Sequence, residues 1–182
     1  MLFRSIGKKY LRGAMGYGGP CFPRDNVAFS VLARGNKVPA LLAEATDQVN
    51  KRQAPRLCEV FRSKIKAGGV AAVLGLSYKP NTPVIEESQG VRLAQVLADA
   101  GFKVVVYDPQ AMPNAKRELK GDITYATSAA DCLRQADAAA KANSGQAEIA
   151  RIAINPISPN REGRFFCTQV LGAMNFPKSR VA

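Results

Sequence analysis

Residues 70–76 read Val-Ala-Ala-Val-Leu-Gly-Leu, a continuous apolar run typical of a strand that is buried on both faces. After a polar loop, residues 89–100 carry apolar side chains on one helical face, and Gly101 is placed to cap this helix. Residues 102–107 form a second apolar run that ends at Asp108. Strand, helix and strand at this spacing predict a βαβ unit, and therefore a parallel sheet in an α/β fold.

Upstream of this unit the pattern predicts helices. One helix is expected over about residues 23–33, ended by Gly35-Asn36, and a second begins near Val38-Pro39. Apolar residues at helical spacing continue to Ile65 before Gly68-Gly69 ends the run, and Pro55 should kink or split it. An ordinary amphipathic core helix satisfies the same periodicity.

Downstream, residues 123–126 are expected to form a further strand, followed by a helix with Ser128 as its cap and Asp131 at the third position. From residue 138 the sequence Ala-Ala-Ala-Lys-Ala-Asn-Ser-Gly-Gln does not look like an apolar strand. We expect an irregular, partly disordered tail, in which residues 152–157 and 165–170 are candidates for short paired strands. A shifted reading frame near residue 138 is the alternative explanation.

Histidine is absent, which excludes Ser-His and Cys-His dyads, every His-containing zinc site and any His general base. Proton transfer must then use carboxylates, Lys, Tyr, Cys or water. The four cysteines, at positions 21, 58, 132 and 167, form no C-x-x-C pair. We therefore expect neither a metal site nor a redox motif.

The charge balance is strongly basic. The formal net charge is +12, and residues 1–38 hold seven basic side chains against Asp25 alone. Such a surface attracts nucleic acid, anionic membranes or polyphosphates. No recognisable nucleic-acid fold or aromatic platform accompanies it, so a nucleotide diphosphate explains the charge at least as well. The N-terminus has no apolar signal region, and no segment approaches the roughly 20 apolar residues of a membrane span, so a cytoplasmic protein without a membrane partner is expected.

A second informative stretch is residues 16–25, Gly-Tyr-Gly-Gly-Pro-Cys-Phe-Pro-Arg-Asp. Its glycines let a backbone approach a ligand closely, and Pro23 suits the first position of a helix. The thiol of Cys21, just ahead of that helix, would feel the positive end of its dipole, with Arg24 adding charge and Asp25 lying one turn on. The residues indicate a nucleophile beside a backbone cradle; the alternative is a turn with an inert buried cysteine.

Residues 16–25 resemble the active-site signature of the UDP-glucose/GDP-mannose dehydrogenase family, Gly-aromatic-Gly-Gly-Pro/Ser-Cys-aromatic/Leu-Pro-Lys/Arg-Asp. Residues 75–82, Gly-Leu-Ser-Tyr-Lys-Pro-Asn-Thr, match a second family stretch in the same order. Many members continue with Thr-Asp-Asp-x-Arg-x-Ser, whereas this chain has Glu86 at the position of an Arg that helps to place the cofactor. Some relatives have a Thr-Pro-x-x-Glu-Glu-Ser version. From about residue 138 we expect the resemblance to end.

The resemblance implies three parts. Residues 1–67 would carry the active-site Cys loop and central helices that form a homodimer, residues 68–137 a Rossmann-like nucleotide-sugar-binding domain, and residues 138–182 the divergent tail. The fold is then a helical central segment followed by a Rossmann-like parallel βαβ domain with an irregular C-terminal tail.

The resemblance also implies a reaction, the NAD-dependent oxidation of a UDP-sugar C6 alcohol to a carboxylate through a thiohemiacetal and a thioester. Cys21 would be the nucleophile, Asp25 would assist water or proton transfer, and the glycine backbone would donate N–H groups to the oxyanion. The remaining site residues would touch the substrate: Tyr17, Gly18, Gly19, Tyr78 and Lys79.

The sequence predicts no binding site for NAD. Residues 75–80 lack G-x-G-x-x-G, and Asp108 lies 33 residues after Gly75, where about 20 is usual for the ribose-binding acid. The family's NAD domain and the Lys and Asn that precede its Cys motif have no counterpart here, so we expect a fragment that binds a UDP-sugar but is inactive alone. The alternative is a non-catalytic dimerisation or polyanion-binding module.

Overall fold

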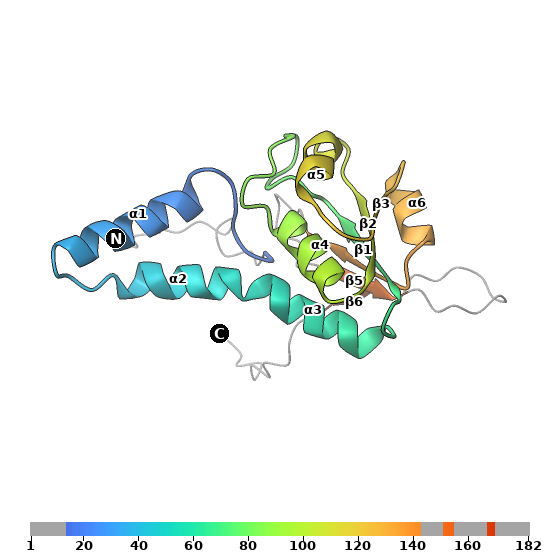
Figure 1. Cartoon of the computed structure of the whole chain (residues 1–182), viewed down its shortest axis with the longest axis horizontal. Helices are drawn as coiled ribbons and strands as arrows, with labels where there is room; N and C mark the ends of the chain where they lie inside the picture. Colours follow the sequence, from blue (N-terminus) through green and yellow to red (C-terminus); the bar gives the residue numbers. More distant parts are fainter. Residues whose placement is uncertain (1–13, 143–150, 155–166, 170–182) are drawn as a thin grey trace, which may run out of the picture.

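The computed structural model in Figure 1 describes residues 14–142, 151–154 and 167–169. Three helices come first in this part of the chain: α1 (Phe22–Gly35), α2 (Leu41–Lys51) and α3 (Gln53–Lys64). Strands and helices then alternate: β1 (Val70–Leu74), α4 (Gln89–Asp99), β2 (Lys103–Tyr107), α5 (Met112–Glu118), β3 (Ile123–Tyr125), α6 (Ala129–Arg134) and β4 (Ala138–Lys141). The strands β5 (Arg151–Ile154) and β6 (Cys167–Gln169) follow.

The strands form one sheet in the order β3-β2-β1-β4-β5-β6. β1 is parallel to both β2 and β4, and β2 is parallel to β3, which confirms the predicted α/β fold with a parallel sheet. β5 is antiparallel to β4 and to β6. The two candidate strands of the tail therefore do pair, over shorter ranges than the sequence suggested.

The expectation that the stretch from Ala138 to Gln146 contains no strand is wrong, because β4 covers Ala138–Lys141. Its three alanines are buried and lie level with Ala71, Ala72 and Val73 of β1. Alanine has no intrinsic preference for strands, so the sequence pattern alone gave no strand signal. The small side chains fit here because helices cover both faces of the sheet at this position.

Alternate residues of the strands face two different helical layers. Val73 and Val106 face the larger core with α3, α4 and α5, whereas Ala72 and Val105 face the smaller core with α6. Phe61 of α3 belongs to the larger core and is fully buried, and α3 packs against α4. The helical segment is thereby fixed to the sheet domain through its last helix.

Helix ends follow the predicted capping chemistry. The Ser128 hydroxyl accepts from the Asp131 N–H at 3.0 Å, and the Asp131 carboxylate in turn accepts from the Thr127 N–H rather than that of Ser128. At the C-terminus of α4, Gly101 has φ +85 and its N–H donates to the Ala98 carbonyl. Because Gly101 turns the chain here, β2 starts directly beside β1.

Pro55 splits the second helical run, as predicted. The break falls at Arg52, so that Pro55 becomes the third residue of α3, where a missing N–H costs no intrahelical bond. α1 begins one residue before Pro23 and ends at Gly35, and α2 begins at Leu41, slightly later than expected.

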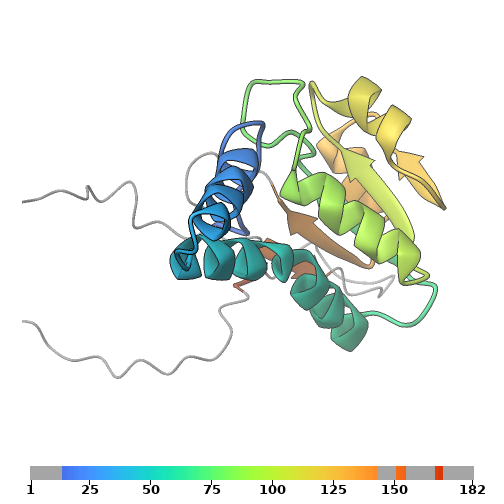
Figure 2. The same cartoon turned by 60° about the vertical axis from the view of Figure 1, so that its left-hand side comes forward.

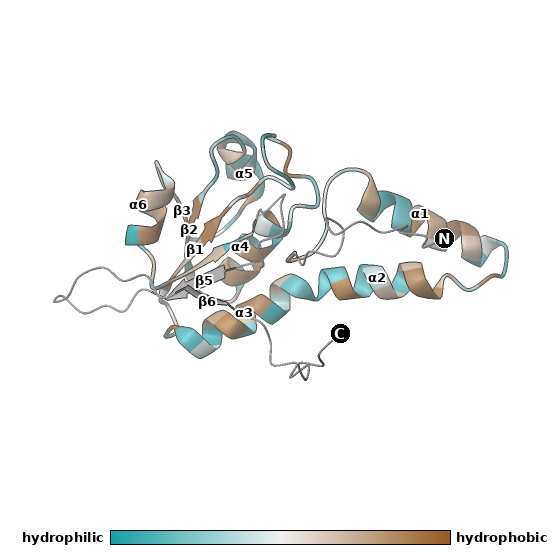
Figure 3. Cartoon of the chain, turned by 180° about the vertical axis from the view of Figure 1, so that it is seen from behind, coloured by the Kyte–Doolittle hydropathy of each residue, from teal (hydrophilic) through white to brown (hydrophobic). Residues whose placement is uncertain are grey.

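α1 and α2 form an antiparallel hairpin that projects from the sheet domain, and the two helices lie side by side in both views (Figure 1, Figure 2). Viewed from behind, apolar residues follow the hairpin along much of its length (Figure 3). Nine large apolar residues of this hairpin are exposed: Phe22, Val27, Phe29, Val31, Leu32, Val38, Leu41, Leu42 and Val49. No helix in the described ranges is long and apolar enough to cross a membrane.

Candidate active site

Cys21 stands at the start of α1, as the sequence predicted. It is the residue before the helix, it is exposed, and its carbonyl accepts the Asp25 N–H at 2.8 Å. Cys58 and Cys132, by contrast, are buried. Of these three cysteines, Cys21 is thus the one that solvent reaches, and it lies at the positive end of a helix dipole.

Arg24 and Asp25 form an exposed ion pair beside this thiol, with 3.0 Å between Arg24 Nη2 and Asp25 Oδ1. The hydrogen bond and charge of Asp25 raise the pKa of Arg24, and the thiol of Cys21 and Glu86 contribute less. The Arg24 charge is therefore shared with Asp25 and is not reserved for the thiol. Burial of Cys58 raises the pKa of its thiol, which leaves it protonated at neutral pH.

The glycines that precede Cys21 pack against other parts of the protein. The Gly19 N–H donates to the Glu86 carbonyl at 2.9 Å, so it is engaged within the chain and does not point at a reacting oxygen. Gly19 has φ +90, and a Cβ there would lie 2.6 Å from ring atoms of Tyr78. A Cβ on Gly18 would collide with the Glu87 carbonyl oxygen. Glycine is needed here so that two loops can touch.

This contact brings the two sequence motifs together. Gly19 rests on the ring of Tyr78, although the two residues belong to different parts of the chain. The Lys79 ammonium lies 5.3 Å from the centroid of the same ring and is otherwise exposed, and the Tyr78 N–H donates to the Val84 carbonyl. The loop that carries Cys21 therefore meets the loop that carries a cation and an aromatic ring.

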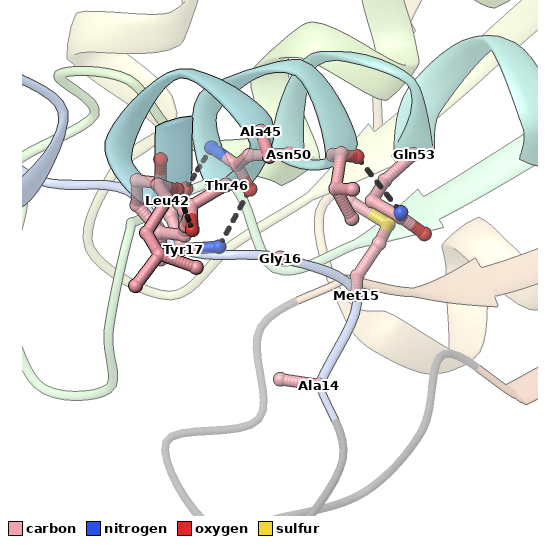
Figure 4. A pocket seen from close by; sticks show the side chains of 10 residues that line it. Ala14, Met15, Gly16, Tyr17, Leu42, Ala45, Thr46, Asn50 and Gln53 are labelled. Carbon is pink, nitrogen blue, oxygen red and sulfur yellow. Dashed lines mark hydrogen bonds between the residues drawn. The ribbon is translucent and has the colours of Figure 1, made fainter. Parts of the chain in front are cut away.

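Tyr17 points elsewhere, toward α2. Its backbone N–H donates to Asn50 Oδ1, and its carbonyl accepts from Asn50 Nδ2 and Gln89 Nε2, each at 2.9 Å (Figure 4). Asn50 and Gln89 are both buried, and they tie the Cys loop to α2 and α4. The sequence analysis did not predict either residue. For Asn50 a signal was available: it lies seven residues after Ala43, on the same face of the helix, so its polar side chain falls on the apolar side.

A cavity of about 420 Å³ lies between this segment and α2 (Figure 4). Its walls are Ala14, Met15, Gly16, Tyr17, Leu42, Ala45, Thr46, Val49, Asn50 and Gln53. The buried Tyr17 hydroxyl and Gln89 Oε1 accept or donate no hydrogen bond within the described residues. Burial, and to a smaller degree the Asp47 carboxylate, raise the pKa of Tyr17. The Tyr17 side chain thus lies near Asn26 of α1 and near Asp47 and Lys51 of α2.

Asp108 is a further buried carboxylate at the carboxyl end of β2, and the sequence did not single it out as a site residue. Oδ2 accepts from Leu76 N, Ser77 N and Ser77 Oγ at 2.8–3.0 Å, and Oδ1 accepts from Gln110 N and Ala111 N at 2.8 Å. Burial acts to raise the pKa of Asp108, but the four backbone N–H groups outweigh it and hold the pKa below its usual value.

Comparison with known proteins identifies the family. The central domain of the UDP-glucose/GDP-mannose dehydrogenase family matches residues 2–52, and the UDP binding domain of the same family matches residues 72–158. The chain belongs to the UDP-glucose/GDP-mannose dehydrogenase family. The match to residue 158 also corrects the expectation that the resemblance ends at about residue 138.

Relatives of known name agree with this assignment. The chain is 44% identical over 135 residues to the UDP-glucose 6-dehydrogenase AglM of Haloferax volcanii, which covers 74% of this chain and 31% of that protein. It is 38% identical to the UDP-glucose 6-dehydrogenase of Rhizobium meliloti, covering 76% of this chain and 31% of the relative. The chain thus spans about a third of the length of the curated relatives it matches.

Among solved structures, a UDP-glucose dehydrogenase from Pyrobaculum islandicum superposes with a TM-score of 0.71 at 34% identity, covering 79% of this chain and 34% of that one. A GDP-mannose dehydrogenase from Pseudomonas aeruginosa shares the fold at 21% identity, with a TM-score of 0.64, over 76% of this chain and 34% of that one. The α/β fold of this chain is therefore a family fold.

The sheet domain of this family member does not fit NAD in the manner of a dinucleotide fold. The Asp108 carboxylate is fully used by its five donors, so it cannot also bind a ribose. A long loop separates β1 from α4, and the backbone of Gly90 in the first turn of α4 abuts the Gly75 carbonyl, where a pyrophosphate would need room. A cavity of about 300 Å³ at this edge is lined by Leu74, Ser77, Asn81, Thr82, Tyr107 and Lys141 among others. We therefore identify no NAD-binding residue in the described part of the sheet domain.

Proposed function

We propose that this chain is a fragment that holds the nucleotide-sugar substrate and supplies the covalent nucleophile of an NAD-dependent nucleotide-sugar 6-dehydrogenase, of the type that converts UDP-glucose to UDP-glucuronate. The observation that carries the proposal is the contact of Gly19 with Tyr78, which places the Cys21 loop against the loop of Lys79. The family of the chain and the names of its relatives support the substrate class.

Cys21 is proposed to act on the C6 aldehyde of the sugar. The thiolate sulfur forms a bond to C6 while the carbonyl π pair moves to oxygen, which takes up a proton, giving a thiohemiacetal. Cys21 is exposed and stands directly before α1, where a substrate can reach its sulfur. Oxidation to the thioester requires a hydride acceptor, NAD by the family resemblance, and the described residues form no site for it.

Asp25 is proposed to assist the hydrolysis that follows. Water adds to the thioester carbonyl, the carbon–sulfur bond breaks, and the Cys21 thiolate leaves with the carboxylate product released. Asp25 lies one helical turn from Cys21 and carries its side chain beside Arg24, so a group that can exchange a proton with water stands near the thiol.

Tyr78 and Lys79 are proposed to form the wall of the substrate site. The exposed Lys79 ammonium is placed to meet an anionic diphosphate or a sugar hydroxyl, with Tyr78 beneath it. Tyr17, Gly18 and Gly19 are proposed to shape the same wall through their backbone positions. Hydride transfer by residues 1–182 alone is not expected, because the sheet domain does not fit a dinucleotide.

Calorimetric titration with UDP-glucose, UDP-glucuronate and GDP-mannose tests this proposal. Saturable binding of the UDP-sugars, weakened about tenfold by Lys79→Ala, is the expected result. Lys66→Ala, at an exposed position between α3 and β1, is the matched control. A folded chain that binds none of the three, or NAD reduction by the chain alone, would contradict the proposal.

The second candidate is a dimerisation module, favoured by the exposed apolar side chains of the α1–α2 hairpin. The hairpin would bury them against the same surface of a second copy, giving a homodimer through the central helices. Leu42→Glu, at an exposed position on α2, should then shift a dimer to a monomer in sedimentation analysis, whereas Gln48→Glu should not. Salt-sensitive binding to heparin without a preference for UDP-sugars would instead indicate a polyanion-binding module.

A further inference from the structure

We propose that Asp108 is a positioning residue for the active-site loop, because its carboxylate fixes the turn ahead of Tyr78-Lys79 on which the Cys21 loop rests. The inference builds on the proposed roles of Cys21 and Lys79. It adds to them a residue that touches neither the thiol nor the substrate.

The two carboxylate oxygens serve two different turns. Oδ2 holds the turn after β1 through the N–H groups of Leu76 and Ser77, while Oδ1 holds the turn after β2 through those of Gln110 and Ala111. Asp108 is 3% exposed, so water cannot replace a lost acceptor. The loop after β1 is thereby tied to the end of β2 at the point where it leaves the sheet.

The position of this turn is passed to the Cys21 loop by direct contacts. Ser77 precedes Tyr78, whose N–H is held by the Val84 carbonyl and whose ring supports the Gly19 backbone. The Gly19 N–H is bound to Glu86, which belongs to the same loop after β1. A shift of Ser77 therefore moves the surface under Gly19, two residues before Cys21.

Only a carboxylate satisfies both turns at once. In an Asp108→Asn variant one oxygen becomes an NH2 group, and either orientation of the amide points that donor at the N–H groups of one turn. If the amide oxygen serves Gln110 and Ala111, then Leu76 and Ser77 lose their acceptor. Because asparagine has the same size, the variant keeps the packing but loses the hydrogen bonds that join the turn after β1 to the turn after β2.

The test measures hydrogen exchange of backbone amides in Asp108→Asn, with Asp122→Asn, an exposed acid ahead of β3, as the matched control. We expect the amides of Leu76, Ser77 and Gly19 to exchange about tenfold faster or more, while Val104 and Val106 in the sheet keep their wild-type rates. A role in general stability alone would raise exchange in the sheet as well. The affinity for UDP-glucose should fall about tenfold in the same variant and stay unchanged in the control.

Unchanged exchange at Gly19 in folded Asp108→Asn would overturn the proposal, whatever the affinity. Should that variant not fold, Ser77→Ala, which removes the hydroxyl bond to Oδ2, takes its place. In Ser77→Ala, an exchange rate of the Gly19 amide about threefold above the wild-type rate supports the proposal, and an unchanged rate overturns it. Failure of the wild-type chain to bind UDP-glucose would count against the proposed function, and the exchange rates would still decide the role of Asp108.

Discussion

The Cys21 loop depends on residues that allow its backbone to touch a second loop. Gly19 illustrates this, because its positive φ and its contact with the Tyr78 ring both exclude a side chain. Asn50 and Gln89 hold the preceding residue through buried hydrogen bonds. The position of Cys21 is therefore set by the backbone contacts of the residues just before it.

Replacing Gly19 by alanine should detach the loop. The new Cβ meets the Tyr78 ring and the backbone keeps an unfavourable φ, so we expect a loss of about 2 kcal/mol in the free energy of unfolding. Denaturant unfolding measures it. Gly35→Ala is the matched control, because a Cβ at Gly35 meets nothing within 4 Å, and its stability should stay the same or rise. Equal losses in both variants would contradict the argument.

Cys132 should make stability fall at alkaline pH. Burial raises the pKa of its thiol to about 12, well above the value of about 8.5 in an unfolded chain. Since the folded state holds this proton more tightly, the stabilisation is complete below about pH 8.5 and is lost as the pH rises toward 12, at up to about 1.4 kcal/mol per pH unit. The difference in unfolding free energy between wild type and Cys132→Ala should shrink over this range. A constant difference would show that the thiol stays accessible.

At the scale of elements, α4 joins the two halves of the described chain. It packs on β1, β2 and α3, and its first turn begins at Ser88, directly after the loop that touches Gly18 and Gly19. The cap of α4 thus influences both the sheet domain and the Cys21 loop.

Removing this cap should destabilise the domain measurably. The Ser88 hydroxyl accepts from Gly90 N at 3.2 Å and Val91 N at 3.5 Å, and Ser88→Ala leaves these buried groups without it. A loss of about 1 kcal/mol is expected in thermal or denaturant unfolding. Ser63→Ala, at the exposed end of α3, is the control and should change stability by less than about 0.5 kcal/mol. A smaller loss for Ser88 than for Ser63 would refute the role of the cap.

Elements with a strong apolar pattern could be predicted from sequence, whereas elements stabilised by their surroundings could not. Val104–Val106 and the cap residues Ser128 and Gly101 are local signals, and the structure confirms them. The alanines of β4 carry no such signal, because only the strand and helices around them make them a strand. The match to the UDP binding domain of the family runs from residue 72 to residue 158 and so includes the alanines of β4.

The same division applies to the site. Cys21 at a helix start follows from local sequence, since Pro23 and the glycines mark the boundary. That the glycines face Tyr78 and Glu87 depends on residues far away in the sequence, which no local pattern reports. Asp108 was visible as an acid after a strand, but its five donors come from two separate turns.

The described part of the chain has a sheet domain and a projecting hairpin, along which apolar residues recur (Figure 3). Nine large apolar side chains of this hairpin are exposed. The Cys21 loop lies at the base of the hairpin, where it meets the sheet domain. A ligand that contacts both Cys21 and Lys79 would therefore connect the two parts.

UDP-glucose should stabilise the folded chain as a unit. At a concentration 100 times its dissociation constant, binding to the folded state alone adds about 2.7 kcal/mol to the free energy of unfolding. A thermal melt with and without UDP-glucose measures this. Inorganic phosphate at the same concentration should give a much smaller effect, because it cannot span both loops; equal shifts would indicate a simple anion effect of the basic surface.

The contact of Gly18 and Gly19 with their neighbours also bears on how such sequences diverge. Since these glycines serve the junction between loops, a descendant that exchanged Cys21 for another residue would still need them to keep its shape. Their presence in a distant sequence marks shared architecture, and a pseudoenzyme would retain it. Under the proposed role of Cys21, an active enzyme would differ from an inactive relative at the thiol, so a search for new members should assess that residue separately from the glycines before it.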